Sequence, residues 1–148
     1  MTSTQLTRWD QLAEKVCFET RSFIGGDYFR STSSDVLKTE NPATCVELAV
    51  FSDGNIDTIN GAVVAARKAF PQWRHLAPDQ RKLLLLGVAD QVEAERETLA
   101  LLDCLEMGMP ISMALEQVDG AVEFLRYNAE LVDKSYGDVV PSDTSTTL

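Results

Sequence analysis

The segment ISMALEQVDGAVEFLRYNAELVDK, residues 111–134, shows the strongest periodic pattern in the chain. Its apolar side chains are spaced by 3, 4, 3, 4 and 3 residues, at Leu115, Val118, Val122, Leu125, Ala129 and Val132. Because an α-helix completes a turn in about 3.6 residues, these side chains share one face. The spacing predicts a helix from about Ile111 to Lys134, with its apolar stripe buried in a core or in a subunit contact.

The region immediately before this helix is predicted to be helical as well. Pro78 suits the first position of a helix and Gly108 suits the residue after its end, while a break is expected near Arg96. Asn55 suits the N-cap of an earlier helix, and Pro71 is expected to end that helix. The apolar residues of this earlier helix that share one face are Ile56, Ile59, Val63, Ala66 and Phe70.

The N-terminal third is predicted to be mostly extended. A short helix is expected over residues 6–20, followed by a hairpin that turns at Gly25-Gly26, because glycine accepts the positive φ of a tight turn. Strands are expected over residues 36–40 and 46–51, joined by a proline-containing turn. The predicted fold is therefore a small antiparallel β hairpin or sheet followed by three to four long helices.

Composition and charge exclude several classes of protein. The 148 residues include 13 basic and 23 acidic groups, which gives a net charge of −10, and 45% of the residues are apolar. This length suits one domain that buries roughly 68–70% of the surface of its unfolded chain. No stretch approaches the roughly 18 apolar residues of a membrane span. The negative charge argues against nucleic acid and anionic membrane surfaces as partners.

The sequence offers few residues for chemistry. Cys17, Cys45 and Cys104 are widely spaced and no secretory signal precedes them, so they are predicted to be free thiols in the cytoplasm. All three are expected to act as small apolar side chains. His75 is expected to be solvated in a polar loop, and the acidic run of residues 90–106 to form a solvated helix face. The residues alone therefore indicate no catalytic or metal site.

The order of several short motifs carries more information than any one motif. Phe-Ile-Gly-Gly at 23–26 precedes Thr-Glu-Asn-Pro-Ala-Thr at 39–44, and Pro-Asp-Gln-Arg at 78–81 precedes Leu-Leu-Asp-Cys-Leu-Glu-Met-Gly-Met-Pro at 101–110. From about Phe23 to Gly137, this succession resembles the N-terminal part of the NAD(P)-dependent aldehyde dehydrogenases, whose fold is α/β. The start of the chain is most similar to the gamma-glutamyl-gamma-aminobutyraldehyde dehydrogenase branch.

The resemblance implies that the chemistry of such an enzyme lies outside this chain. In the family, the nucleophilic Cys, the base Glu and the cofactor-binding turn all lie C-terminal to the region that this chain resembles. None of its cysteines matches the nucleophile, so no catalytic and no cofactor-binding residue is assigned. NAD or NADP is implied for the full-length family, and no cofactor is expected for this chain alone.

One site of the family does fall within the resemblance. Several members hold a structural monovalent cation through main-chain oxygens of a Thr-x-Asn-Pro segment and an acidic side chain of a Leu-Asp-x-Gly-Lys-Pro segment. The matching residues are Thr39, Glu40 and Glu106, and oxygen ligands suit a hard cation. The alternative is that Glu106 is an ordinary charge at a helix end.

Three residues depart from the usual pattern of the family. Cys45 replaces a Gly after Asn-Pro-Ala-Thr, at a turn that can require a positive φ. Met109 replaces a Lys after Gly108, and Ala77 replaces the Ser or Thr that usually caps the helix beginning at Pro78. Loss of such a cap costs about 0.5–2 kcal/mol.

The resemblance implies an N-terminal fragment of an NAD(P)-dependent aldehyde dehydrogenase that is inactive on its own. Residues 1–22 would form an N-terminal helix, residues 23–137 the first segment of the cofactor-binding domain, and residues 138–148 a polar tail that begins the oligomerisation hairpin. The implied partners are further copies of the enzyme and the missing catalytic domain. The alternative is a non-catalytic helical module that pairs with a full-length relative through the stripe of residues 115–132.

Overall fold

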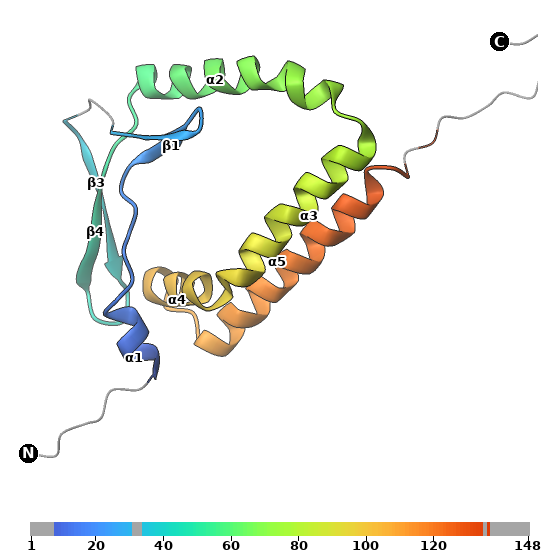
Figure 1. Cartoon of the computed structure of the whole chain (residues 1–148). Helices are drawn as coiled ribbons and strands as arrows, with labels where there is room; N and C mark the ends of the chain where they lie inside the picture. Colours follow the sequence, from blue (N-terminus) through green and yellow to red (C-terminus); the bar gives the residue numbers. More distant parts are fainter. Residues whose placement is uncertain (1–7, 31–33, 135, 137–148) are drawn as a thin grey trace, which may run out of the picture.

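The computed structural model describes residues 8–30, 34–134 and 136. Two β-hairpins are followed by four long helices, as Figure 1 shows, which confirms the predicted succession. The elements in chain order are α1 Arg8–Ala13, β1 Ser22–Ile24, β2 Asp27–Phe29, β3 Val36–Asn41, β4 Val46–Ser52, α2 Ile56–His75, α3 Pro78–Ala94, α4 Arg96–Met107 and α5 Ile111–Leu131. No helix among the described residues is long and apolar enough to cross a membrane.

The predicted antiparallel pairing is confirmed, and the strands form two separate two-stranded sheets among the described residues. In the first hairpin, β1 and β2 turn through Gly25 and Gly26, whose φ values of 67° and 98° confirm the predicted use of glycine. The Phe23 and Tyr28 rings meet edge to face, with centroids 5.3 Å apart. Strand β2 and the start of α2 line the two sides of an open hollow.

Strands β3 and β4 form the second hairpin, and its turn is held by Asn41. The Asn41 carbonyl oxygen accepts from the Cys45 amide at 2.7 Å, and its side-chain oxygen accepts from the Ala43 amide at 2.9 Å. The register shifts between Thr39 and Glu40, which marks a β-bulge. Cys45 has a φ of 56°, so the predicted need for a left-handed residue in this turn is confirmed.

Helix α2 begins where the sequence predicts but ends later. The side-chain oxygen of Asn55 accepts from the Thr58 amide at 2.9 Å and caps the helix. The prediction that Pro71 ends the helix was wrong, because α2 continues through it to His75. A proline removes one hydrogen bond without preventing the next turn from forming. The helix ends before Pro78 instead, which keeps Ala77 extended at φ −61° and ψ 150°.

Helices α3, α4 and α5 form the helical core. The predicted break near Arg96 is confirmed, since Glu95 separates α3 from α4. Helix α5 ends at Leu131, three residues before the predicted end, and Figure 1 shows it lying along α3. The core consists of small and medium side chains, at Ala89, Ala100, Leu101, Ala114, Val118, Val122 and Ala129. Such side chains let helix backbones approach closely. Val118, Val122 and Ala129 of the predicted stripe are buried in this contact, while Leu115, Leu125 and Val132 are half-buried.

Helix α2 does not bury the apolar face that its sequence predicts. Ile56, Ile59, Val63 and Phe70 remain between 44% and 67% exposed. The chain has an accessible surface of 11577 Å², which is about half of the roughly 23,600 Å² expected for its unfolded form. Within residues 8–30, 34–134 and 136, nothing covers this apolar face of α2.

The first helix is shorter than predicted. Helix α1 ends at Ala13, whereas the sequence pattern extended to residue 20. From Val16 onward, β-branched and aromatic side chains lower the helix propensity, and the chain runs on without regular structure to β1. Helix α1 is held beside α4, where the Arg8 guanidinium donates to both carboxylate oxygens of Glu97.

Candidate functional site

The two segments of the predicted cation site lie next to each other. Thr39 and Glu40 are in β3, Glu106 is in the last turn of α4, and β3 contacts α4. Just beyond these residues, a Cβ atom added to Gly108 would lie 3.0 Å from the Cγ atom of Pro42. The end of α4 therefore packs directly on the turn between β3 and β4. The structure thus brings together segments that are more than sixty residues apart in the sequence.

The donor groups at this junction are all oxygen atoms. Thr39 is half-buried, while Glu40 and Glu106 are exposed. Within the described residues, Glu106 forms no hydrogen bond or ion pair, so its carboxylate is available to a cation. Two carbonyl groups and one carboxylate suit a hard monovalent ion, but they fill only part of the usual shell of about six oxygens. The chemistry of these oxygens suits such an ion, and further ligands would be needed to complete its shell.

Neighbouring charges leave this junction negative. The Lys38 ammonium lies 2.6 Å from a carboxylate oxygen of Glu47, the residue paired with Glu40 across the hairpin. This hydrogen bond raises the pKa of Lys38 above its usual value, and the charge of Glu47 adds to the effect. Lys38 pairs with Glu47, whereas Glu40 and Glu106 form no ion pair within the described residues.

The ends of α3 and α4 show how the structure accommodates Gly108 and two residues that depart from the family pattern, Ala77 and Met109. Gly108 ends α4 in the left-handed conformation, at φ 70°, as its position predicts. Ala77 offers no side-chain cap to α3, as the sequence implies. Gln80 gives partial compensation, since its side-chain oxygen accepts from the Ala77 amide at 3.3 Å. Met109 is half-buried and packs against the core of α4 and α5.

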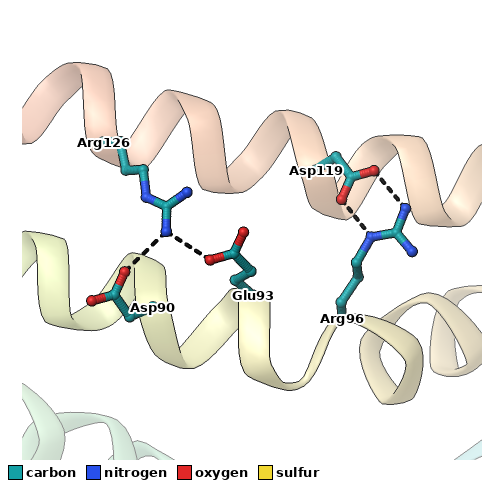
Figure 2. Close-up of polar contacts among 5 residues, drawn as sticks. All are labelled: Asp90, Glu93, Arg96, Asp119 and Arg126. Carbon is teal, nitrogen blue, oxygen red and sulfur yellow. Dashed lines mark hydrogen bonds and ion pairs between the residues drawn. The ribbon is translucent and has the colours of Figure 1, made fainter.

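The acidic run of residues 90–106 is more than a solvated face. Figure 2 shows Arg126 of α5 between Asp90 and Glu93 of α3, at 3.0 Å and 2.7 Å. It also shows Arg96 holding both carboxylate oxygens of Asp119 on α5. The hydrogen bond from Arg96 holds the pKa of Asp119 below its usual value. Charges of this run therefore tie α3 and α4 to α5, although all of them stay partly exposed.

The cysteines and the histidine form no joint site. Cys17 and Cys45 are exposed, which contradicts the expectation of buried apolar side chains, and Cys104 is half-buried. All three are free thiols. His75 lies in the last turn of α2 rather than in a loop, and its Nδ1 atom donates to the Pro71 carbonyl at 2.6 Å. Among the described residues, no three His, Cys, Asp or Glu side chains gather where a metal could bind.

Sequence reasoning did not indicate the hollow between the first hairpin and α2. An open cavity of about 240 Å³ lies there, lined by Tyr28 and Phe29 on one side and by Asn55 and Thr58 on the other. Asn55 and Thr58 serve the helix end there, and Asp27 and Asp57 also line the cavity. No sequence signal could have found this hollow, since it depends on how the hairpin leans on the helix.

Comparisons with known proteins show which family this chain resembles. Residues 28–148 match the aldehyde dehydrogenase family. The Escherichia coli (strain K12) protein "NADP/NAD-dependent aldehyde dehydrogenase PuuC" is 35% identical over 142 residues, which cover 94% of this chain and 29% of that protein. This chain therefore spans less than a third of the length of that relative.

Solved structures show the same relationship. The aldehyde dehydrogenase KauB from Pseudomonas aeruginosa superposes with a TM-score of 0.87 and 34% identity, over 95% of this chain and 30% of its own. Gamma-glutamyl-gamma-aminobutyraldehyde dehydrogenase from Burkholderia cenocepacia J2315 superposes with a TM-score of 0.86 and 33% identity, over 91% of this chain and 28% of its own. The strands and helices described above are thus arranged as in these enzymes.

Proposed function

The chain belongs to the aldehyde dehydrogenase family and corresponds to an N-terminal fragment of such an enzyme. From this premise we propose that it is part of an enzyme that oxidises an aldehyde to a carboxylate with NAD or NADP. The superposition on KauB over 95% of the chain, at a TM-score of 0.87, carries this proposal. The fragment supplies hairpins and helices, while the reacting groups belong to the rest of the enzyme. Its free thiols fit the reducing cytoplasm.

A chimera tests this function. It joins residues 1–148 of this chain to the remaining C-terminal part of the Escherichia coli relative. We expect the purified chimera to reduce NAD or NADP with an aldehyde substrate, as followed by the absorbance of the reduced cofactor, and the 148-residue chain alone to show no rate. The unchanged relative is the positive control. A folded chimera that is inactive with both cofactors would contradict the proposed function.

The cation site is a second part of the proposal. The main-chain oxygens of Thr39 and Glu40 and the carboxylate of Glu106 would hold a monovalent cation that stabilises the junction of β3 and α4. In the chimera, we expect sodium or potassium chloride to raise the melting temperature above that in choline chloride at equal ionic strength. Glu106→Gln should reduce this difference, whereas Glu116→Gln, an exposed change on α5, should not. Equal responses of both variants would contradict the assignment.

The proposed place in the whole enzyme follows the family. Residues 23–137 would form the first segment of its cofactor-binding domain. Residues 138–148, proposed to begin the hairpin through which subunits associate, lie outside the described residues. The whole enzyme would be a homo-oligomer. Size-exclusion chromatography with light scattering on the active chimera tests this point, since a mass of one chain at all concentrations would contradict it.

We propose the enzyme fragment over the alternative, a non-catalytic module that pairs with a full-length relative, because part of the predicted contact surface of such a module is buried within this chain. The stripe of residues 115–132 was expected to make that contact, but Val118, Val122 and Ala129 are buried against α3 and α4. The mass of the isolated chain, measured with and without the full-length relative, separates the two functions. A stable mixed complex would favour the module.

A further inference from the structure

The outward face of α2 is apolar and open. Ile56, Ile59, Val63 and Phe70 recur at helical spacing along one arc of the helix and are 67%, 53%, 44% and 56% exposed. The first hairpin packs on the other side of the helix. A Cβ atom added to Gly25 of this hairpin would lie 3.7 Å from the Cβ atom of Ala65. The hairpin therefore covers one side of α2, and the apolar arc faces away from it.

Little in the part of the chain that the structure describes holds α2 in its position. It packs mainly on β1, and Figure 1 shows that it extends away from the pair of α3 and α5. Nevertheless, the chain superposes on KauB over 95% of its residues with a TM-score of 0.87, so α2 has the orientation found in that complete enzyme. The matched region is only 30% of KauB, so most of that enzyme lies elsewhere.

We propose that the outward face of α2 is the docking surface for the C-terminal part of the aldehyde dehydrogenase fold. This inference rests on the proposed function and adds the surface through which the two parts meet. An exposed apolar helix face is stabilised when a complementary apolar surface removes it from water. Arg67 and Arg74 follow the same arc at its edge, so the covering surface is apolar with acidic or carbonyl groups along one border.

A pair of adjacent valines provides a matched test. Val63 lies on the apolar arc, whereas Val64 is rotated by about 100° around the helix and lies outside it. Both are exposed in this chain, at 44% and 64%. Val63→Asp and Val64→Asp therefore change the same side chain in the same way, one residue apart. We expect both variants to leave the helical circular dichroism of the isolated chain unchanged, because both positions face water there.

In the chimera the two variants should differ. Val63→Asp places a carboxylate in the covered interface, so we expect its melting temperature to fall by several degrees, while Val64→Asp stays close to the unchanged chimera. Hydrogen exchange gives a second measurement that needs no variant. The amides of α2 should exchange rapidly in the isolated chain and be protected in the chimera.

The outcomes separate this inference from the proposed function. Equal melting temperatures of the two variants, or equal exchange of α2 in both proteins, would overturn the docking surface even if the chimera is active. Protection of α2 in an inactive chimera would support the docking surface and contradict the function. An insoluble chimera, under conditions in which the Escherichia coli relative is soluble, would count against the docking surface.

Discussion

At the scale of single residues, Cys45 carries a conformational cost. Its φ of 56° lies in the left-handed region, which costs an L-residue roughly 1–2 kcal/mol. Cys45→Gly removes this strain but adds freedom to the unfolded chain, so we expect a net gain of up to about 1 kcal/mol. Urea unfolding followed by circular dichroism measures the change.

Cys45→Ala is the control for this prediction. It removes the exposed thiol but keeps the Cβ atom and therefore the strain. We expect its unfolding midpoint to stay near that of the unchanged chain. If Ala stabilises as much as Gly, the thiol rather than the backbone conformation is the cause.

Two glycines should respond to alanine in opposite directions. At Gly108, φ is 70° and the new Cβ atom would lie 3.0 Å from Pro42, so we expect a loss of more than about 1 kcal/mol. At Gly87, inside α3, the added methyl group meets open space, and we expect a gain of about 0.5–1 kcal/mol. Chemical unfolding of both variants tests the signs, and a gain at Gly108 would show that the α4 end does not need a left-handed residue.

At the scale of elements, ion pairs connect α3 and α4 to α5. The hydrogen bond from Arg96 lowers the pKa of Asp119, so the folded state binds this proton less readily than the unfolded state. The resulting stability is present above the usual carboxyl pKa and is lost as pH falls through the lower folded value. Asp119→Asn should therefore lower the melting temperature near neutral pH, and the difference should shrink in acid.

Glu116→Gln is the matched control on the same helix. Glu116 is exposed and forms no ion pair within the described residues, so we expect no comparable change of melting temperature at any pH. Melting curves of the three proteins from neutral to acidic pH provide the measurement. A constant difference between Asp119→Asn and the unchanged chain would contradict the ion-pair explanation.

The sequence was sufficient to predict which helix faces are apolar, but not which part of the protein buries each face. The stripe from Leu115 to Val132 predicted a buried face, and α3 and α4 bury it because both belong to the same chain. The pattern from Ile56 to Phe70 is equally regular, yet it faces water. Periodicity shows that a face is apolar, whereas the identity of its partner depends on tertiary structure.

Local backbone chemistry could also be predicted where one residue type decides it. Gly25-Gly26, Asn55, Gly108 and the position of Cys45 all have the predicted conformations. Pro71 was the exception, because a helix with hydrogen bonds on both sides can tolerate one missing donor. The proximity of Glu106 to Thr39 and Glu40 could come only from the family resemblance, since no local pattern relates segments so far apart.

At the scale of the whole molecule, charge and exposed apolar surface oppose each other. The net charge of −10 makes copies of the chain repel, whereas the open face of α2 attracts them. Salt shortens the range of this repulsion, since the Debye length falls from about 30 Å at 0.01 M to about 3 Å at 1 M ionic strength. We therefore expect light scattering to show a larger mass in high salt. A mass of 16.3 kDa in both conditions would contradict this balance.

The uncovered face of α2 also bears on the fate of the free chain in a cell. Chaperones and proteases act on proteins that expose apolar segments, and they keep the level of incompletely folded chains low. A copy whose α2 is covered would escape them, while an uncovered copy would be removed. The amount of this polypeptide in the cell would then depend on how much of the C-terminal part of the fold is present to cover α2. The helix would thereby signal to quality control whether assembly is complete.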